Sequence, residues 1–117
     1  MKITALLPLA LAGSVFASTP CSEKAPSAMA AIQKFCSQMN IMVPSNYAKT
    51  GQRGYTDATR VSITGNCKPA MWVPHNYCMS QFENMCSNGG KHGGSTHKYG
   101  KNGCQHWEIQ YNTGGAL

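Results

Sequence analysis

The sequence predicts an α+β fold: a small, disulfide-stapled single domain in which two helices pack on a small, mainly antiparallel sheet. Three observations lead to this prediction. Apolar residues recur at helical spacing in two segments, polar and apolar residues alternate in two others, and six cysteines are spread along a chain of 117 residues.

The first helix is expected from Ser22 to Met39. Pro26 and Ser27 suit its first turn or its cap, because proline lacks the N–H that an interior helical residue donates. The segment 43–45, which contains a proline, ends the element. One apolar stripe at positions i, i+3, i+4 and i+7 is expected to face the core, and it consists of Ile32, Phe35, Cys36 and Met39.

The middle of the chain is expected to hold a loop and two strands. Residues 46–59 are polar and contain glycines, which favours a loop. Residues 60–64 alternate polar and apolar side chains, as in a half-buried strand, and Gly65 and Asn66 then mark a turn. The apolar run 71–73 is interpreted as a short buried strand before Pro74.

A second helix is expected over Asn76–Cys86, with Asn76 as its cap. Its apolar face consists of Cys78, Phe82, Met85 and Cys86. At about 1.5 Å per residue, the two cysteines lie about 12 Å apart along the helix axis. A disulfide needs Cα atoms less than about 7 Å apart, so Cys78 and Cys86 must pair with cysteines elsewhere.

The last strand is expected at residues 104–111, where polar and apolar residues alternate again. On this pattern one face, toward the core, carries Trp107, Ile109 and Tyr111, and the other carries His106, Glu108 and Gln110. The tail, residues 112–117, is polar and glycine-rich and is expected to fray.

The first 17 residues are interpreted as a signal peptide that is removed after Ala17. Lys2 gives a positive start and an apolar run follows, while no other segment approaches the length of a membrane span. The secreted domain is then residues 18–117, with no transmembrane segment. Its charge is +5, since nine basic residues remain against four acidic ones. Sparse, scattered charges of both signs favour no specific nucleic-acid partner.

The cysteines are interpreted as structural. An even number behind a signal peptide indicates three disulfides, with 15 connectivities open. No Cys-x-x-Cys pair occurs, which argues against zinc and thioredoxin-like sites. The six residues are Cys21, Cys36, Cys67, Cys78, Cys86 and Cys104.

Catalysis and metal binding receive little support from the sequence. A small secreted ribonuclease needs a general base, a general acid and a cation, and His106 and Glu108 are merely alternate residues on one predicted strand face. No Gly-x-Ser-x-Gly motif occurs. His92 and His97 could join His75 or His106 around a metal, but a glycine-rich loop supplies no rigid support. We expect no enzyme, no metal and no cofactor.

A glycine-rich stretch between Cys86 and Cys104 is the candidate binding site. It is expected to be a loop of about 16 residues, and loops of this length are usually functional or disordered. Its glycines let backbone N–H groups approach a polar ligand. The predicted ligand-binding residues are Lys91, His92, His97, Lys98, Tyr99 and Lys101.

Two segments, GNCKPAMWVPHNYCMSQFENMCSNGG and YGKNGCQHWEIQ, resemble small secreted cysteine-rich fungal proteins of the effector type. In particular they resemble the fungal glycan-binding, lectin-like family, and the upstream AIQKFCSQMNIMVP is compatible with it. The resemblance implies a compact fold of helices and strands and extracellular carbohydrate recognition without a cofactor.

The sequence therefore favours a secreted, non-catalytic protein that binds an extracellular glycan or another host-surface or apoplastic component. A role as a virulence effector follows if the producing organism is a pathogen. The alternative is an antimicrobial or cytotoxic protein acting on anionic cell surfaces, suggested by the basic charge. A secreted ribonuclease is the third hypothesis.

Overall fold

A computed structural model gives the arrangement of residues 19–56 and 58–112. The predicted signal peptide, residues 1–17, lies outside this described range, as do residues 113–117 of the predicted tail. Within the described range, no helix is long and apolar enough to cross a membrane.

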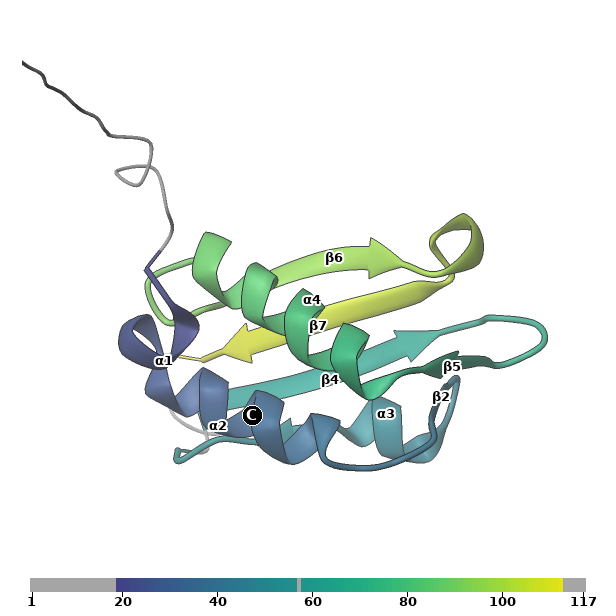
Figure 1. Cartoon of the computed structure of the whole chain (residues 1–117), viewed down its shortest axis with the longest axis horizontal. Coiled ribbons are helices and arrows are strands. Elements are labelled where there is room, and N and C mark those ends of the chain that lie inside the picture. Colours follow the sequence, from purple (N-terminus) through teal and green to yellow (C-terminus); the bar gives the residue numbers. More distant parts are fainter. Residues whose placement is uncertain (1–18, 57, 113–117) are drawn as a thin grey trace, which may run out of the picture.

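The described chain forms two layers, with helices on one face of an antiparallel sheet (Figure 1). This sheet has the strand order β3-β4-β7-β6, and a separate two-stranded sheet pairs β2 with β5. The helices are α1 (Cys21–Lys24), α2 (Pro26–Cys36), α3 (Asn46–Thr50) and α4 (His75–Asn88). The strands are β2 (Ile41–Val43), β3 (Gln52–Arg53), β4 (Thr59–Gly65), β5 (Met71–Val73), β6 (Ser95–Tyr99) and β7 (Gln105–Tyr111), and a short 3-10 turn, η2, covers Lys101–Gly103. The predicted disulfide-stapled α+β class is confirmed.

The strand register gives the main sheet one apolar and one polar face. Val61 of β4 lies opposite Ile109 of β7, and Ile63 lies opposite Trp107. All four side chains are buried, while the residues between them point to the other face. The predicted core orientation of Trp107 and Ile109 is confirmed. Tyr111 belongs to the same face but is 37% exposed, because it lies at the end of β7.

Aromatic contacts join α2 and α4 to the apolar face of the sheet. Phe35 of α2 packs edge-on against Phe82 of α4, with ring centroids 5.7 Å apart. Phe82 in turn packs against Trp107 of β7 at 4.6 Å. All three side chains are at most 1% exposed. Full burial of a side chain of this size contributes roughly 1.5–3 kcal/mol, so these rings hold the two layers together.

The first helix differs from its predicted bounds. Ala25 leaves the helical region at φ −146° and ψ 76°, because the residue before a proline is disfavoured in the helical conformation. Pro26 then begins α2, which ends at Cys36. The predicted apolar stripe therefore stops before Met39, which is 79% exposed.

Short elements were missed in the region predicted as a loop, residues 46–59, which holds α3, β3 and the start of β4. The side chain of Ser45 caps α3 by accepting a hydrogen bond from the Ala48 backbone N–H at 3.1 Å. Elements this short show no periodicity of their own. β2 was also missed, since its residues follow directly on the predicted first helix.

The second helix is confirmed, but it begins one residue earlier than predicted and ends two residues later, at Asn88. α4 begins at His75, directly after Pro74. Asn76 is not its cap: the Asn76 Oδ1 atom accepts a hydrogen bond from the backbone N–H of the next residue, Tyr77, at 3.1 Å. His75 Nδ1 reaches back to α2, where it lies 2.8 Å from the carbonyl oxygen of Cys36.

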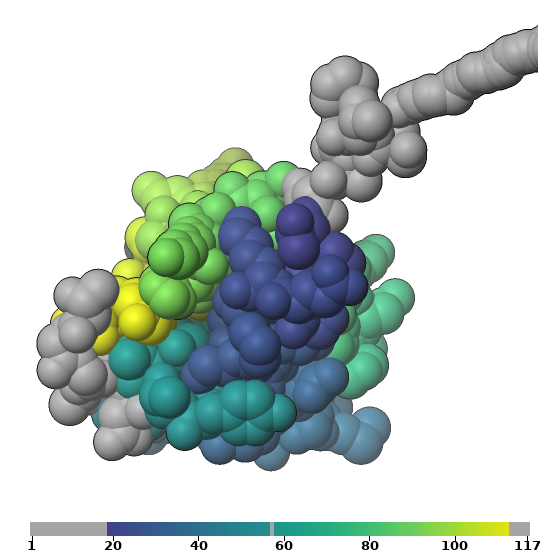
Figure 2. Space-filling view, turned by 90° about the vertical axis from the view of Figure 1, so that its left-hand side faces the viewer, coloured from purple at the N-terminus to yellow at the C-terminus, as the bar shows by residue number. Residues whose placement is uncertain are grey.

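All six cysteines form disulfides, as predicted, and the structure selects one of the open connectivities. Cys21–Cys86 and Cys36–Cys78 link α1 and α2 to α4, and Cys67–Cys104 links the segments that follow β4 and precede β7. Cys78 and Cys86 have separate partners, as the helix geometry requires. α1 and α2 both contact α4, and Figure 2 shows the purple and blue α1–α2 segment beside the green residues of the region where α4 ends and the next turn begins.

Candidate functional site

The stretch between Cys86 and Cys104 is not the unstructured loop that its composition predicts. β6 occupies Ser95–Tyr99 and pairs antiparallel with β7, and η2 follows it. β6 is an edge strand whose three central side chains are exposed, so its sequence lacks the apolar alternation that identifies a strand. β6 is therefore stabilised by backbone hydrogen bonds to β7 rather than by burial of its side chains.

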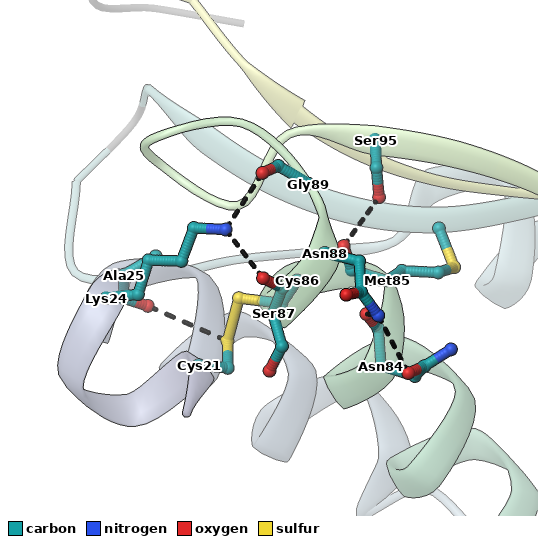
Figure 3. Close-up of a disulfide and its surroundings, with 10 residues drawn as sticks. All are labelled: Cys21, Lys24, Ala25, Asn84, Met85, Cys86, Ser87, Asn88, Gly89 and Ser95. Atoms are coloured by element: carbon teal, nitrogen blue, oxygen red, sulfur yellow. Dashed lines mark hydrogen bonds between the residues drawn. A yellow bond between two sulfur atoms is a disulfide. The ribbon is translucent and has the colours of Figure 1, made fainter. Parts of the chain in front are cut away.

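The start of the stretch is fastened to α1 (Figure 3). Lys24 Nζ donates hydrogen bonds to the carbonyl oxygens of Ser87 and Gly89, each at 2.8 Å, beside the Cys21–Cys86 disulfide. A cation in this position is favourable, since the carbonyl end of a helix carries partial negative charge. The end of α4 and the turn after it are therefore held in place.

The six predicted binding residues do not converge on one site. Lys91 and His92 lie in the turn before β6, and Lys101 follows the opposite end of that strand, which spans about 14 Å. His92 stacks on Tyr111, with centroids 4.0 Å apart. Lys91 and His92 therefore lie at one end of β6, and Lys101 lies at the other.

Alternation along β6 separates the remaining three residues. Lys98 lies opposite His106, on the polar face of the sheet. His97 and Tyr99 belong to the face that the helices cover, and their rings are 4.4 Å apart. Within residues 19–56 and 58–112, no three His, Cys, Asp or Glu residues gather closely enough to hold a metal ion.

A pocket of about 310 Å³, the aromatic pocket, lies where β5, α4 and the adjoining ends of β6 and β7 meet. Trp72 and Tyr77 are 58% and 55% exposed, and within the described residues neither stacks on another ring. Tyr99 packs edge-on against buried Trp107 at 4.9 Å. The lining residues are Met71, Trp72, Val73, Pro74, Tyr77, Gln81, Tyr99, Gly100, Gln105 and Trp107.

Two glutamines, Gln81 and Gln105, are among the residues that line the aromatic pocket. Gln81 Oε1 is buried and has no hydrogen-bond partner in the described structure, although buried polar atoms are normally paired. Gln105 Oε1 accepts a hydrogen bond from Trp107 Nε1 at 2.7 Å. Burial raises the pKa of the Tyr99 hydroxyl, which therefore remains a neutral donor at physiological pH. The residues that line the pocket thus combine flat rings with two side-chain amides and the hydroxyl of Tyr99.

A second hollow, the lysine groove, adjoins the aromatic pocket. Its volume is about 770 Å³, and Met71 lines both hollows. The backbone N–H of Lys101 points to Met71 Sδ at 3.4 Å. The groove is lined by Asn66, Cys67, Lys68, Pro69, Ala70, Met71, Lys101, Asn102, Gly103 and Cys104.

The polar face of the sheet carries the residue types that the ribonuclease hypothesis needs. His106 and Glu108 are two residues apart on β7, with Cα atoms about 7 Å apart. Lys98 lies opposite His106, and Arg60 Nε donates a hydrogen bond to Gln110 Oε1 at 3.0 Å. Neither His106 nor Glu108 lines the aromatic pocket or the lysine groove. A solvated strand face is the better explanation of this pair, and the ribonuclease remains an untested hypothesis.

Most of the aromatic pocket was not predicted. Trp72 was expected inside a buried strand, but β5 pairs only with β2, and its register places Trp72 opposite exposed Met42. Successive side chains of a strand point to opposite faces, so the middle residue of the run 71–73 faces away from its two neighbours. This rule could have predicted that Trp72 points outward. Tyr77 and Gln81, four residues apart on α4, lie outside the apolar face of that helix. Only Tyr99 belongs both to the pocket and to the predicted set.

Comparisons of the chain with protein-family models, with curated proteins and with solved structures find no significant match.

Proposed function

We propose that this chain is a secreted, non-catalytic protein that binds an extracellular glycan in the aromatic pocket. The single observation that carries the proposal is the meeting of exposed Trp72 and Tyr77 with the buried, unpaired Gln81 Oε1 atom. The three disulfides are typical of proteins that fold in oxidising compartments, which supports secretion. Action as a virulence effector remains part of the same proposal.

The rings of Trp72 and Tyr77 supply the apolar part of sugar recognition. One face of a pyranose ring presents C–H groups, and an aromatic ring with a free face packs against them. More than half of each side chain is exposed, although large aromatic residues usually bury most of their surface. A sugar ring laid on these side chains removes that apolar surface from water.

Gln81 supplies the polar part. An acceptor that is buried without a partner costs about 1–3 kcal/mol. Because Gln81 Oε1 is buried, the Gln81 side chain must turn toward the pocket to accept a hydrogen bond from a sugar hydroxyl, and this hydrogen bond recovers the cost. Ligand pockets commonly combine apolar walls with a few such polar groups.

The lining of the aromatic pocket favours binding over hydrolysis. Glycoside hydrolysis uses a pair of carboxyl groups in most families, and the residues that line this pocket include no Asp, Glu or His. A glycan held there meets rings, amides and hydroxyls. These groups recognise a sugar without cleaving it.

The test is binding of the oxidised protein to an array of cell-wall oligosaccharides, followed by calorimetry with the best ligand. We expect Trp72→Ala to weaken binding about fivefold or more, since truncation of a central aromatic residue often costs over 1 kcal/mol. Tyr55→Ala is the matched control, because Tyr55 is 79% exposed and lines neither hollow. Failure of the wild-type protein to bind any oligosaccharide overturns the proposal, as does equal binding by Trp72→Ala.

A further inference from the structure

We infer that the glycan is anionic, and that the lysine groove holds its carboxylate or sulfate group while a sugar ring lies in the aromatic pocket. This inference rests on the proposed function and adds the chemical class of the ligand. Lys68 and Lys101 are the residues that would contact the anion.

The two lysines are held beside the aromatic pocket by covalent and polar contacts. Lys68 directly follows Cys67, Lys101 precedes Cys104 by three residues, and the Cys67–Cys104 disulfide joins the two segments. The Lys101 N–H contact to Met71 Sδ ties this arrangement to β5. Gly100, which lines the aromatic pocket, is the neighbour of Lys101 in the chain. Because the two hollows share Met71 and adjoin at Gly100 and Lys101, a ligand of two or more sugar rings can contact both.

The charge of the groove is uncompensated within the described structure. Both lysine side chains are exposed, and no carboxyl group is among the residues that line the groove. The described acidic residues lie elsewhere: Glu23 on α1, Glu83 on α4 and Glu108 on β7 line neither hollow. Two cations without a local counter-ion create a positive potential that favours an anionic ligand.

The polar neighbours of the lysines suit the same ligand. Asn66 and Asn102 also line the groove, and the side-chain amide of each carries N–H donors for an anionic oxygen. The groove, at about 770 Å³, is larger than the aromatic pocket at about 310 Å³. It therefore has room for a charged sugar residue next to the one on the aromatic rings.

The experiment compares an anionic oligosaccharide with a neutral one that has the same sugar rings. Calorimetry measures binding of an oligogalacturonate and of its fully methyl-esterified form, which has the same rings without the carboxylates. A sulfated oligosaccharide forms a third arm, because carboxylate and sulfate share the anionic chemistry that the groove recognises. Tighter binding of the uronate or of the sulfated ligand identifies which anion is preferred, and either result supports the inference.

Two double variants test whether the lysine groove causes the preference for the anionic ligand. We expect the wild-type protein to bind the uronate at least tenfold more tightly than the ester. Lys68→Gln with Lys101→Gln should remove this preference, because binding of the uronate falls to the level of the ester. The matched control, Lys34→Gln with Lys49→Gln, removes the same charge from α2 and α3, which line neither hollow, and should retain the preference.

The outcomes separate this inference from the proposed function. Equal affinity of the wild-type protein for all three ligands overturns the anionic preference but leaves glycan binding standing. A preference that survives in the Lys68/Lys101 variant, or that the Lys34/Lys49 control loses equally, overturns the role of the groove. If the wild-type protein binds none of these ligands and no neutral oligosaccharide of the array, the proposed function itself fails.

Discussion

The unpaired Gln81 Oε1 atom lowers the free energy of unfolding of the free protein. A ligand that donates a hydrogen bond to this atom removes the loss. Its neighbour in the aromatic pocket, Gln105, has its Oε1 satisfied by Trp107 Nε1, whereas Gln81 Oε1 accepts no hydrogen bond in the described structure. Groups kept in such a state are common where a protein is shaped for a ligand rather than for its own stability. Stability and binding should therefore respond in opposite directions when this atom is removed.

Gln81→Met tests that trade-off. The substitution keeps the length of the side chain and removes the unpaired acceptor, so we expect the free energy of unfolding to rise by about 1 kcal/mol. Glycan affinity should fall about fivefold, because one hydrogen bond to the ligand is lost. Urea unfolding and calorimetry measure the two effects. Gln33→Met, at an exposed position on α2, should change neither, and a destabilised Gln81→Met protein would contradict the argument.

At the scale of single residues, the sequence predicted the core better than the site. Trp107 and Ile109 follow from alternation along one strand, which is a local signal. Trp72 and Gln81 belong to the site because of what lies beside them in space, and no local pattern records that. Of the six predicted binding residues, Tyr99 lines the aromatic pocket and Lys101 lines the lysine groove.

Among the elements, the turn from α4 into β6 requires a glycine at position 93. Gly93 has φ +84°, and a Cβ atom there would lie 2.9 Å from Cys86 Sγ and 3.2 Å from the Ala28 Cβ atom. Only glycine adopts such a φ without strain. The turn sets where β6 begins, and therefore where Tyr99 meets the aromatic pocket.

Gly93→Ala should lower the free energy of unfolding by about 1–3 kcal/mol, since strain in the backbone adds to the contact with the disulfide. Gly90→Ala is the matched control in the same turn, because its nearest neighbour would lie 3.7 Å away and its φ is not in the left-handed region. It should be close to neutral. Urea unfolding of both variants provides the comparison, and similar losses in the two would show that local strain at Gly93 is not the cause.

Element prediction succeeded where an element buries a periodic face. α4 and β7 each present several apolar residues toward the core, and both were predicted. β6 and α3 were missed, because β6 is an exposed edge strand and α3 buries only Ala48. Such elements are stabilised by pairing or capping with partners outside their own sequence.

In the molecule as a whole, the three disulfides stabilise two different parts of the fold. Cys21–Cys86 and Cys36–Cys78 fix the helical layer, whereas Cys67–Cys104 joins the two segments that form the lysine groove. The closed loops span 65, 42 and 37 residues. In the chain-entropy view each bridge contributes about 4 kcal/mol, a large share of the 5–15 kcal/mol typical of small domains.

Removing one disulfide at a time should distinguish its effect on the free energy of unfolding from its effect on glycan affinity. Cys67→Ala with Cys104→Ala and Cys21→Ala with Cys86→Ala should each lower the free energy of unfolding by about 4 kcal/mol. Only the first pair should also weaken binding of the anionic glycan, because only its bridge orders the groove. Urea unfolding gives the stabilities, and calorimetry is carried out where both variants remain folded. Equal loss of affinity in the two variants would count against a localised role.

The sequence by itself determined the α+β class, the use of all six cysteines in disulfides, and the separate partners of Cys78 and Cys86. Each of these follows from local spacing or from the rise of a helix. Only the tertiary structure decided the cysteine pairing and the two adjoining hollows. The physical reason is that Trp72, Gln81 and Tyr99 come from three different elements, and their meeting depends on strand register and helix packing.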